Sequence, residues 1–591
     1  MKATLFKKYT YAFLFLFSLS CFSQKTLFDT SAMQKNAQSK QSIEVSKNYA
    51  KKENVRTSYT NFSINSDIFN ADKVVFKIDG KTFSAFLLEK NVRGEDDFTW
   101  FGKTDEGFGI FFTVKNGRVA SKFSVGDYSY TLVPLKRNGE HILIEFRDTN
   151  VGRCGNERDS YPRDEGPIRL EDERGLAKND NDCTLRVLLA TTPTARTEIA
   201  AAGFDLPTFA QVMVDEANLA YITSQIGITM ELGVLIETNY TESLGNSHQT
   251  DVARFRNGTN GLNIAHTYRN IYQTDLQVLI RRNEPGIFGI VFDIPLGNSY
   301  NQANGYATVA VDGVTDGRFS FTHEVGHLQG ARHDNHNANP SYGRGFVSGT
   351  GTNAWRTIMA RTAAAPCNQA NSCRIGSFSN PNINGPGGVA SGNNGRNNAR
   401  RLNESANSIN AYRQVPTNLF LQSETIQDNY VSNHLAKTRI DTNNNNIYYQ
   451  DESVGTMRAS EEIVLRPGTF IEQGADFRAY TVNDPCENPA FLRQANTDGG
   501  RIERIESNEL ELTLYPNPSS NTINVRLSET LQNFTVEIYD YQSNARVFVN
   551  DYKEIAENEV TIDVSNFKTG IYILRLSGEG NTVITSKFVK K

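Results

Sequence analysis

Beyond its N-terminus the chain lacks any apolar run that approaches the ~20 residues needed to cross a bilayer. The sequence therefore predicts no transmembrane segment in the mature chain. It also lacks a strong excess of charge, since 61 Lys and Arg stand against 66 Asp and Glu, for a formal net charge of -5. A chain so nearly balanced has no general attraction for nucleic acid, so we expect no nucleic-acid partner.

The N-terminus has the layout of a secretory signal. Lys2, Lys7 and Lys8 precede an apolar run over 11–22, and the small and polar residues Ser23 and Gln24 follow it. The sequence therefore predicts a signal peptide over 1–24, and with it export. Cys21 raises lipidation as an alternative, but Ser18 stands where a lipoprotein signal usually has leucine, so simple cleavage is favoured.

Cysteine is scarce, and removal of the signal leaves five cysteines in a chain bound for an oxidising compartment. Five is an odd number, and two disulfides plus one thiol account for it. Cys367 and Cys373 form the best local pair, whereas the pairing of Cys154, Cys183 and Cys486 cannot be deduced from the sequence.

At 591 residues the chain is too long for one hydrophobic core, which predicts a multidomain protein. Short alternating strands with Asp-Gly and Asn-Gly turns predict a β-rich unit, and a charged linker poor in apolar residues follows it. We assign 25–182 to a β-rich propeptide and cleavable linker. Arg163, Arg174 and Lys178 are its candidate cleavage sites.

The pattern changes at Leu185, where a buried-strand run, a helical stretch and a second strand run follow one another. This order predicts an α/β domain over 183–412. Residues 416–500 alternate apolar and polar positions with Gly and Pro at turns, which predicts a β-rich spacer or accessory module. The last segment, 512–591, is typical of a compact antiparallel β-sandwich. We find no convincing internal repeat.

The stretch HEVGHLQGARHD, which begins at His323, carries the chemistry. His323 and His327 are four residues apart, so on a helix both imidazoles lie on one face and can reach one metal ion. Gly330 lets the chain leave the helix so that His333 can return to the same ion. Glu324 stands beside the first ligand, placed to act on water rather than to bind the metal.

This stretch matches the motif H-E-x-x-H-x-x-G-x-x-H of the metzincin clan at every defined position, and the following Asp334 most resembles the adamalysin/reprolysin branch. The resemblance covers about 183–412. It implies a metzincin metalloprotease domain with a mixed twisted sheet plus helices, and one catalytic Zn²⁺ held by three histidines. It also implies a secreted endopeptidase that hydrolyses extracellular proteins by metal-activated water, with Glu324 as general base. His336 competes as third ligand, although His333 fits the spacing better.

Downstream, the segment TIMA at 357–360 is similar to the Met-turn of that clan, which would place Met359 beneath the zinc ligands. Some branches carry a tyrosine ligand two residues after this methionine, whereas this chain has Arg361. A three-histidine site is therefore expected. Ca²⁺, common in related secreted enzymes, is a further candidate cofactor, although no loop here has a clear calcium signature.

The stretch 305–311 alternates like a strand just before the expected metal-binding helix. In the resembled fold the corresponding strand is the edge of the sheet, to which a substrate peptide adds as one more strand. An interior strand is equally compatible with the sequence, so both positions stay open.

Upstream, GRCGN at 152–156 resembles the cysteine switch of matrix-type metzincins, in which a propeptide thiolate fills the fourth zinc position. The resemblance implies a latent precursor with Cys154 as the inhibitory zinc ligand. The match is short, and Gly152 stands where that family pattern has proline. The alternative is a disulfide between Cys154 and Cys183.

The C-terminal segment resembles the sorting domain of the type IX secretion system of Gram-negative bacteria. Its parts are LYPNP at 514–518, GIYIL at 570–574 and the basic end 587–591. The resemblance implies passage across the outer membrane, followed by release or surface attachment. The partners are then the type IX machinery and protein or peptide substrates.

A function of a different class is a surface adhesin whose metalloprotease-like domain is inert. The complete ligand set and Glu324 argue against it, because an inert domain has no chemical need for all four residues.

Overall fold

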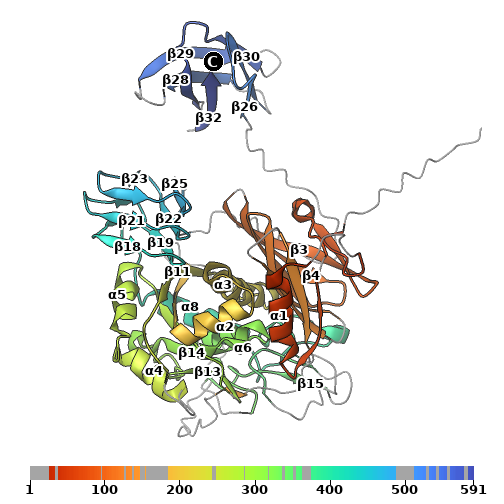
Figure 1. Cartoon of the computed structure of the whole chain (residues 1–591). Coiled ribbons are helices and arrows are strands. Elements are labelled where there is room, and N and C mark those ends of the chain that lie inside the picture. Colours follow the sequence, from red (N-terminus) through yellow and green to blue (C-terminus); the bar gives the residue numbers. More distant parts are fainter. Residues whose placement is uncertain are drawn as a thin grey trace, which may run out of the picture. The chain divides into compact units, whose positions relative to one another are not determined.

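The computed structural model describes residues 26–146, 153–154, 184–486 and 512–591, with shorter gaps inside these ranges of which the longest is 362–373. The chain divides into two compact units, Met1–Gln494 and Ala495–Lys591 (Figure 1). Within the described residues no helix has the length and apolar character required to cross a bilayer.

The first part of the larger unit is an eight-stranded antiparallel sheet with the order β1-β8-β7-β6-β5-β4-β3-β2. Helix α1 (Lys40–Ala50) begins at Ser39, whose hydroxyl accepts a hydrogen bond from the Ser42 amide. The hairpin turns at Gly80 and Gly117 have positive φ, as Asp-Gly and Asn-Gly turns require. The strands are β1 (Val55–Tyr59), β2 (Lys73–Ile78), β3 (Lys81–Gly94), β4 (Asp97–Thr104), β5 (Gly109–Lys115), β6 (Arg118–Val125), β7 (Tyr128–Pro134) and β8 (His141–Phe146).

Both faces of this sheet contribute side chains to hydrophobic cores. Side chains that alternate along a strand point to opposite faces, so Phe112 lies in a core that belongs to the N-terminal part alone. The neighbouring Phe111 lies in a second core, which is shared with the next part of the chain. Strands β4 to β8 are therefore packed against the rest of the unit through one face of the sheet.

The second part is a mixed sheet flanked by helices, in the order β11-β10-β12-β14-β13-β9. Strands β10, β11, β12 and β14 run parallel, and β13 is antiparallel to β14. Every residue of β10 is buried, as expected for a strand covered on both faces. The strands are β9 (Arg153–Cys154), β10 (Leu185–Thr191), β11 (Met230–Glu237), β12 (Leu276–Arg281), β13 (Ile287–Val291) and β14 (Tyr306–Ala310). The helices are α2 (Pro193–Ala201), α3 (Leu206–Thr223), α4 (His248–Asn257), α5 (Asn263–Ile271), α6 (Asp312–Thr315), α7 (Ser320–Leu328) and α8 (Asn398–Asn410).

Strand β14 corrects the edge position implied by the resemblance. It pairs with β12 on one side and with β13 on the other, so it is an interior strand. The outer position next to it belongs to β13, which follows a short loop and turns back antiparallel. No strand was predicted over 287–291, and the edge of the sheet could not be placed without β13.

The third part is a parallel β-helix of three coils. Three parallel ladders, β17-β20-β23, β18-β21-β24 and β19-β22-β25, wind around a common core. Ile426, Tyr449 and Ile471 occupy equivalent places, 23 and 22 residues apart. The expectation that the chain has no internal repeat is therefore wrong. The strands are β17 (Asn418–Phe420), β18 (Glu424–Ile426), β19 (Val431–Leu435), β20 (Arg439–Asp441), β21 (Ile447–Tyr449), β22 (Val454–Ala459), β23 (Glu462–Val464), β24 (Thr469–Ile471) and β25 (Asp476–Thr481).

The β-helix continues the sheet of the second part, because β19 pairs antiparallel with β11 through Ser432 and Val431. One nine-stranded sheet thus runs from β25 through the second part to β9. The multidomain organisation predicted from length is confirmed by the two compact units and the several separate β-sheets.

The smaller unit is built from strands alone within the residues described. Two antiparallel sheets, β26-β27-β30 and β29-β28-β31-β32, contribute side chains to one hydrophobic core. The strands are β26 (Leu512–Tyr515), β27 (Thr522–Leu527), β28 (Gln532–Asp540), β29 (Arg546–Glu554), β30 (Glu559–Asp563), β31 (Gly570–Ser577) and β32 (Val583–Lys590).

Candidate metal centre

Helix α7 carries two of the predicted ligands on one face, and its end brings back the third. The amide of Ala331 donates to the Gly326 carbonyl and the amide of Gly330 donates to the His327 carbonyl, both at 2.9 Å. This pair of bonds is the Schellman ending of a helix, which requires a residue in the left-handed region. Gly330 meets that requirement with a φ of +89°. The chain therefore reverses at Gly330 and places His333 opposite the helix.

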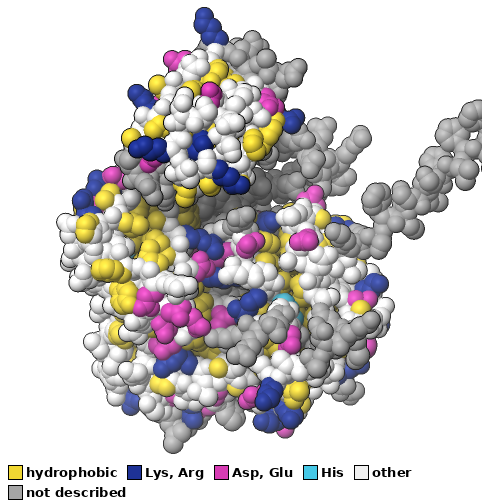
Figure 2. Space-filling view, turned by 45° about the horizontal axis from the view of Figure 1, so that its top comes forward, with side chains coloured by type: hydrophobic (Ala, Val, Ile, Leu, Met, Phe, Trp, Pro, Cys, Tyr) yellow, Lys and Arg dark blue, Asp and Glu magenta, His cyan; other side chains and the backbone are white. Residues whose placement is uncertain are grey.

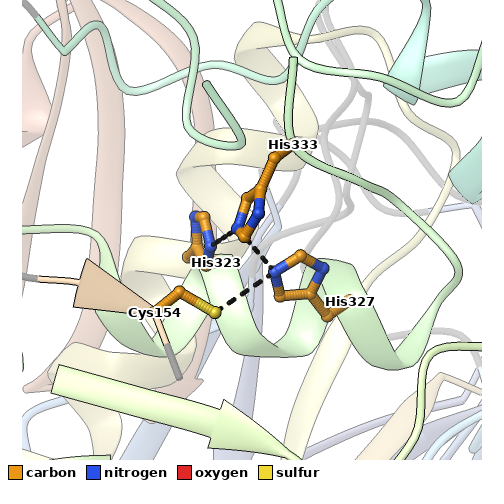
Figure 3. A group of neighbouring side chains, drawn as sticks. All are labelled: Cys154, His323, His327 and His333. Carbon is orange, nitrogen blue, oxygen red and sulfur yellow. Dashed lines mark hydrogen bonds between the residues drawn. The ribbon is translucent and has the colours of Figure 1, made fainter. Parts of the chain in front are cut away.

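The three histidines converge on one point (Figure 3). The Nε2 atom of His333 lies 3.0 Å from Nε2 of His323 and 3.0 Å from Nε2 of His327. Ligands about 2.0–2.1 Å from a tetrahedral zinc ion lie roughly 3.3 Å from one another. The spacing of the three nitrogen atoms thus fits a zinc ion.

The opposite ring nitrogens are held by backbone carbonyls. Nδ1 of His323 lies 2.9 Å from the Ile358 oxygen, and Nδ1 of His327 lies 2.7 Å from the Ala331 oxygen. A carbonyl accepts a hydrogen bond, so each Nδ1 carries the proton and each Nε2 keeps its lone pair for a metal. Burial, followed by the nearby His327 and Arg374, holds the pKa of His323 well below its ordinary value, which keeps this imidazole neutral.

The ligands lie below the molecular surface. His323 is 4% exposed, and His327 and His333 are fully buried. Figure 2 accordingly shows very little histidine surface on the face in view. Such a site excludes bulk water, which strengthens every charge interaction inside it.

Met359 lies against helix α7. It is fully buried, and a Cβ atom added to Gly326 would come within 2.9 Å of its sulfur. The segment that carries it is fixed to a neighbouring loop, because the Ile358 amide donates to the Ser377 carbonyl at 3.0 Å. The carbonyl of the same Ile358 holds His323, so this turn both supports the helix and orients one of the histidines.

Glu324 stands beside the converging nitrogens and is not one of the clustered ligand residues. It is 1% exposed and faces β13, where a Cβ atom added to Gly289 would lie 2.6 Å from its Cγ. Burial raises the pKa of Glu324 to about 8, while the Cys154 thiol and the charges of Arg361 and Arg374 lower it.

Cys154 completes the cluster as a fourth donor. Its sulfur lies 3.5 Å from Nε2 of His327 and 3.8 Å from Oε2 of Glu324, and it forms no disulfide. Ligand atoms of Cys154, His323, His327 and His333 all lie within 4.8 Å of one another. Three imidazoles and one thiolate are a donor set that Zn²⁺ favours.

The strand that carries Cys154 also covers the sheet edge. β9 pairs parallel with β13, with Arg153 opposite Ile287 and Cys154 opposite Gly289. Strand β9 therefore occupies both the fourth corner of the cluster and the edge on which a further strand could add.

Two cationic side chains near the site were not anticipated from the sequence. The charges of Arg361 and Arg374 act on both His323 and Glu324. The Arg361 amide donates to Asp334 Oδ1 at 2.7 Å, and Arg374 follows the longest gap and bridges to Arg356. Arg361 was noted only as the residue that replaces a tyrosine ligand, and no spacing signal connects Arg374 with the motif.

Several predicted residues lie outside the described residues. These are His336, which competed as a ligand, and the cysteines Cys183, Cys367 and Cys373. Cys486 is described and is disulfide-bonded.

Two protein-family models match parts of the chain. The model described as metallo-peptidase family M12 matches residues 180–379, and the model described as a secretion system C-terminal sorting domain matches residues 513–591. The first match contains the histidine cluster, and the second covers nearly the whole of the described part of the smaller unit.

Three similar proteins are each named peptidyl-Asp metalloendopeptidase. That of Stenotrophomonas maltophilia is 34% identical over 49% of this chain and 68% of its own length. That of Xanthomonas campestris is 30% identical over 53% of this chain and 75% of its own length. That of Pseudomonas fragi is 34% identical over 28% of this chain and 84% of its own length.

Proposed function

Because this chain belongs to metallopeptidase family M12 and is a secreted zinc metalloendopeptidase with a type IX sorting domain, we propose that His323, His327 and His333 hold its catalytic metal. The convergence of three buried Nε2 atoms carries this proposal. The sorting domain directs the protein to the extracellular space or the cell surface. The relatives are endopeptidases, which argues against the adhesin alternative.

Glu324 acts as the general base of the proposed reaction. Bound zinc polarises the peptide carbonyl and lowers the pKa of water. Glu324 accepts a proton from the attacking water and returns it to the leaving amide nitrogen, which is the usual work of a positioned carboxylate. The backbone carbonyls of Ile358 and Ala331 keep the imidazoles oriented while this happens.

The edge of β13 receives the substrate backbone. It is the edge that β9 covers in the precursor, and it adjoins Glu324 through Gly289. A peptide that adds to this edge brings its backbone past the general base. The substrate and β9 therefore compete for one place.

Cys154 keeps the precursor latent by occupying the fourth ligand position. The observation that supports this role is the position of its sulfur 3.5 Å from His327 Nε2, on a strand that also fills the edge of β13. A thiolate is a strong zinc ligand and displaces water from the metal.

Cys154→Ser should make the intact precursor active. A serine hydroxyl is a far weaker zinc ligand than a thiolate, so we expect uncleaved precursor to hydrolyse a peptide at least about tenfold faster than wild type. The measurement is the initial rate of fluorogenic peptide cleavage, with intactness of the chain followed on a gel.

Arg153→Ala is the matched control for this variant. Arg153 lies on the same strand but is not among the clustered ligand residues, so latency should be kept. The combination Cys154→Ser with Glu324→Ala should be inactive, which assigns any new activity to this site. Unchanged latency in Cys154→Ser would remove the inhibitory role.

The name of the relatives, peptidyl-Asp metalloendopeptidase, indicates a preference for aspartate in their substrates. We extend this preference to the present chain. The cations that would recognise an aspartate side chain are Arg361 and Arg374, both half-buried and both acting on the histidine and glutamate of the site. A charged hydrogen bond to a carboxylate contributes about 1.5–3 kcal/mol, and Arg matches carboxylate geometry well.

Arg361→Ala combined with Arg374→Ala should therefore reduce selectivity for aspartate. We expect kcat/KM to fall by about 10–100-fold for a peptide with Asp beside the cut bond, and to change little for the matched Asn peptide. Arg254→Ala, on α4, is the control and should leave both rates unchanged, because Arg254 is not among the charges that act on His323 or Glu324. Equal losses on the Asp and Asn peptides would count against recognition by these arginines.

A further inference from the structure

The N-terminal β-sheet shares one hydrophobic core with the catalytic part, which is the mixed sheet together with helices α2 to α8. Phe101, Phe111 and Ile144 of the sheet belong to the same buried cluster as Phe209 and Met213 of helix α3. The two surfaces approach closely, since a Cβ atom added to Gly109 would come within 3.0 Å of a Thr223 methyl group. An interface of this kind resembles a domain interior more than a transient contact.

Buried acidic residues of α3 take their partners from the N-terminal sheet. Lys122 Nζ lies 2.9 Å from Glu216 Oε1, with the two side chains 3% and 0% exposed. The hydroxyls of Thr99 and Thr113 donate to Asp215 Oδ2 at 2.6 and 2.5 Å. Separation would remove the partners of these two carboxylates and expose the apolar face of α3 to water, and each of these changes is unfavourable.

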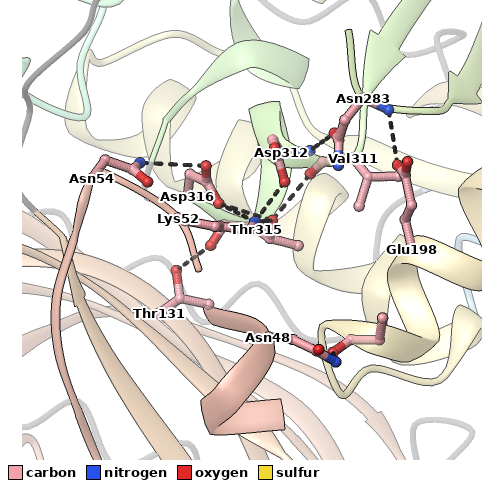
Figure 4. Close-up of polar contacts among 11 residues, drawn as sticks. Asn48, Lys52, Asn54, Thr131, Glu198, Asn283, Val311, Asp312, Thr315 and Asp316 are labelled. Atoms are coloured by element: carbon pink, nitrogen blue, oxygen red, sulfur yellow. Dashed lines mark hydrogen bonds and ion pairs between the residues drawn. The ribbon is translucent and has the colours of Figure 1, made fainter. Parts of the chain in front are cut away.

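Further ion pairs surround this shared core. Lys52 Nζ lies 2.5 Å from Asp312 Oδ1 and 2.8 Å from Asp316 Oδ1, on the segment that leads into α7 (Figure 4). Arg118 pairs with Asp205 at 2.7 Å. In each of these contacts the cation belongs to the N-terminal part, Lys52 between α1 and β1 and Arg118 in β6, and the acid to the catalytic part, so the two surfaces are complementary in charge.

The β-helix holds the N-terminal sheet from a second direction. Lys115 Nζ lies 2.9 Å from Asp476 Oδ2, and Arg478 donates to the Arg93 carbonyl at 3.0 Å. The N-terminal sheet is thus fixed to two parts of the chain that follow the linker.

The order of residues along the chain links these contacts to latency. Cys154 precedes the candidate cleavage sites Arg163, Arg174 and Lys178. A cut at any of them leaves the inhibitory strand covalently attached to the N-terminal sheet. If the sheet stays in place, its inhibitory strand stays with it.

From these observations we propose that cutting the linker does not release the N-terminal domain. Residues 26–154 remain bound as a separate chain, held by the shared core and the ion pairs, and the cut enzyme stays latent until this bound domain is itself removed or degraded. The retention stands on the contacts alone, whereas the continued latency rests on the proposed role of Cys154. Activation thus requires the cut in the linker and then the removal of the bound domain, and only the removal ends latency.

The test uses the precursor without its signal peptide, carrying Glu324→Ala so that it cannot cut itself. The recognition sequence of a site-specific protease replaces part of the linker between Arg163 and Lys178. After complete cutting, size-exclusion chromatography at about 0.15 M salt should return both fragments in one peak. Separate peaks under these conditions would overturn the proposal.

Substitutions then identify what holds the fragments together. Lys122→Met keeps the apolar stem but leaves Glu216 without its cation, and we expect the dissociation constant of the cut complex to rise more than about tenfold. Lys52→Ala and Lys115→Ala, at partly exposed contacts, should each weaken the complex less and test the same interface if Lys122→Met does not fold. Lys81→Ala, exposed at the start of β3, is the control and should change nothing. Affinity that all three interface variants leave unchanged would also overturn the proposal.

The same cut made in the enzyme that retains Glu324 separates the two hypotheses. A single peak without peptidase activity supports both the retention and the role of Cys154. A single peak with full activity supports the retention and contradicts the inhibitory role of Cys154.

Discussion

Glu324→Ala should lower kcat/KM of the mature peptidase by at least about 10²–10⁴-fold, the usual contribution of a general base, and leave the metal in place. The structure gives the reason for both halves of this result. Glu324 is buried beside the histidine cluster but is not among its ligand residues. The backbone carbonyls that orient His323 and His327 do not involve its side chain.

The measurement pairs peptide cleavage with zinc content by mass spectrometry on the same preparation. Glu324→Gln keeps the size of the side chain and should lose activity to a similar extent, which separates loss of the base from loss of packing against Gly289. One zinc per chain without cleavage is the expected outcome. Wild-type rates in either variant would assign proton transfer to another group.

His327→Ala should abolish both metal binding and activity. His327 is fully buried between His333 and Cys154, and its Nε2 lies within 3.5 Å of both donor atoms. Loss of a group that only orients a ligand already weakens metal binding about 10–100-fold, so loss of a ligand should weaken it further. Zinc content should fall from one per chain to nearly zero after dialysis at micromolar metal.

His266→Ala is the control for this substitution. Its ring is stacked on Tyr306 and its Nε2 lies 3.0 Å from the Phe255 carbonyl, away from the histidine cluster. Zinc content should remain at one per chain in this variant. Chelation of the wild-type enzyme should reproduce the inactivity of His327→Ala, and added zinc should restore the wild type alone. Full zinc occupancy in His327→Ala would contradict the proposed ligand set.

The metal-site motif could be read from the sequence because its determinants are local. Helical geometry places positions four apart on one face, and a glycine allows the reversal that returns His333. Eleven consecutive residues therefore contain most of the information. Even the supporting carbonyl of Ala331 comes from within the same stretch.

The remaining features depend on contacts between distant residues. Cys154 and Glu324 are 170 residues apart, and only the folded sheet brings them within 3.8 Å. The position of β14 inside the sheet depends on β13, a five-residue strand with a glycine at its centre. The three coils of the β-helix share spacing but few identical side chains, since the equivalent strands read ETI, IYY and TFI and the last of them has no buried residue. Such repeats become visible once the ladders are known.

Strand β9 runs along the edge of β13 in a fixed direction. β9 runs parallel to β13, whereas a peptide paired antiparallel with β13 would run the other way and use a different hydrogen-bond pattern. Strand β9 thus presents its amides and carbonyls in reverse order to such a peptide. For the proposed latency, this means that β9 can occupy the edge of β13 without offering its own peptide bonds in the orientation of an antiparallel substrate.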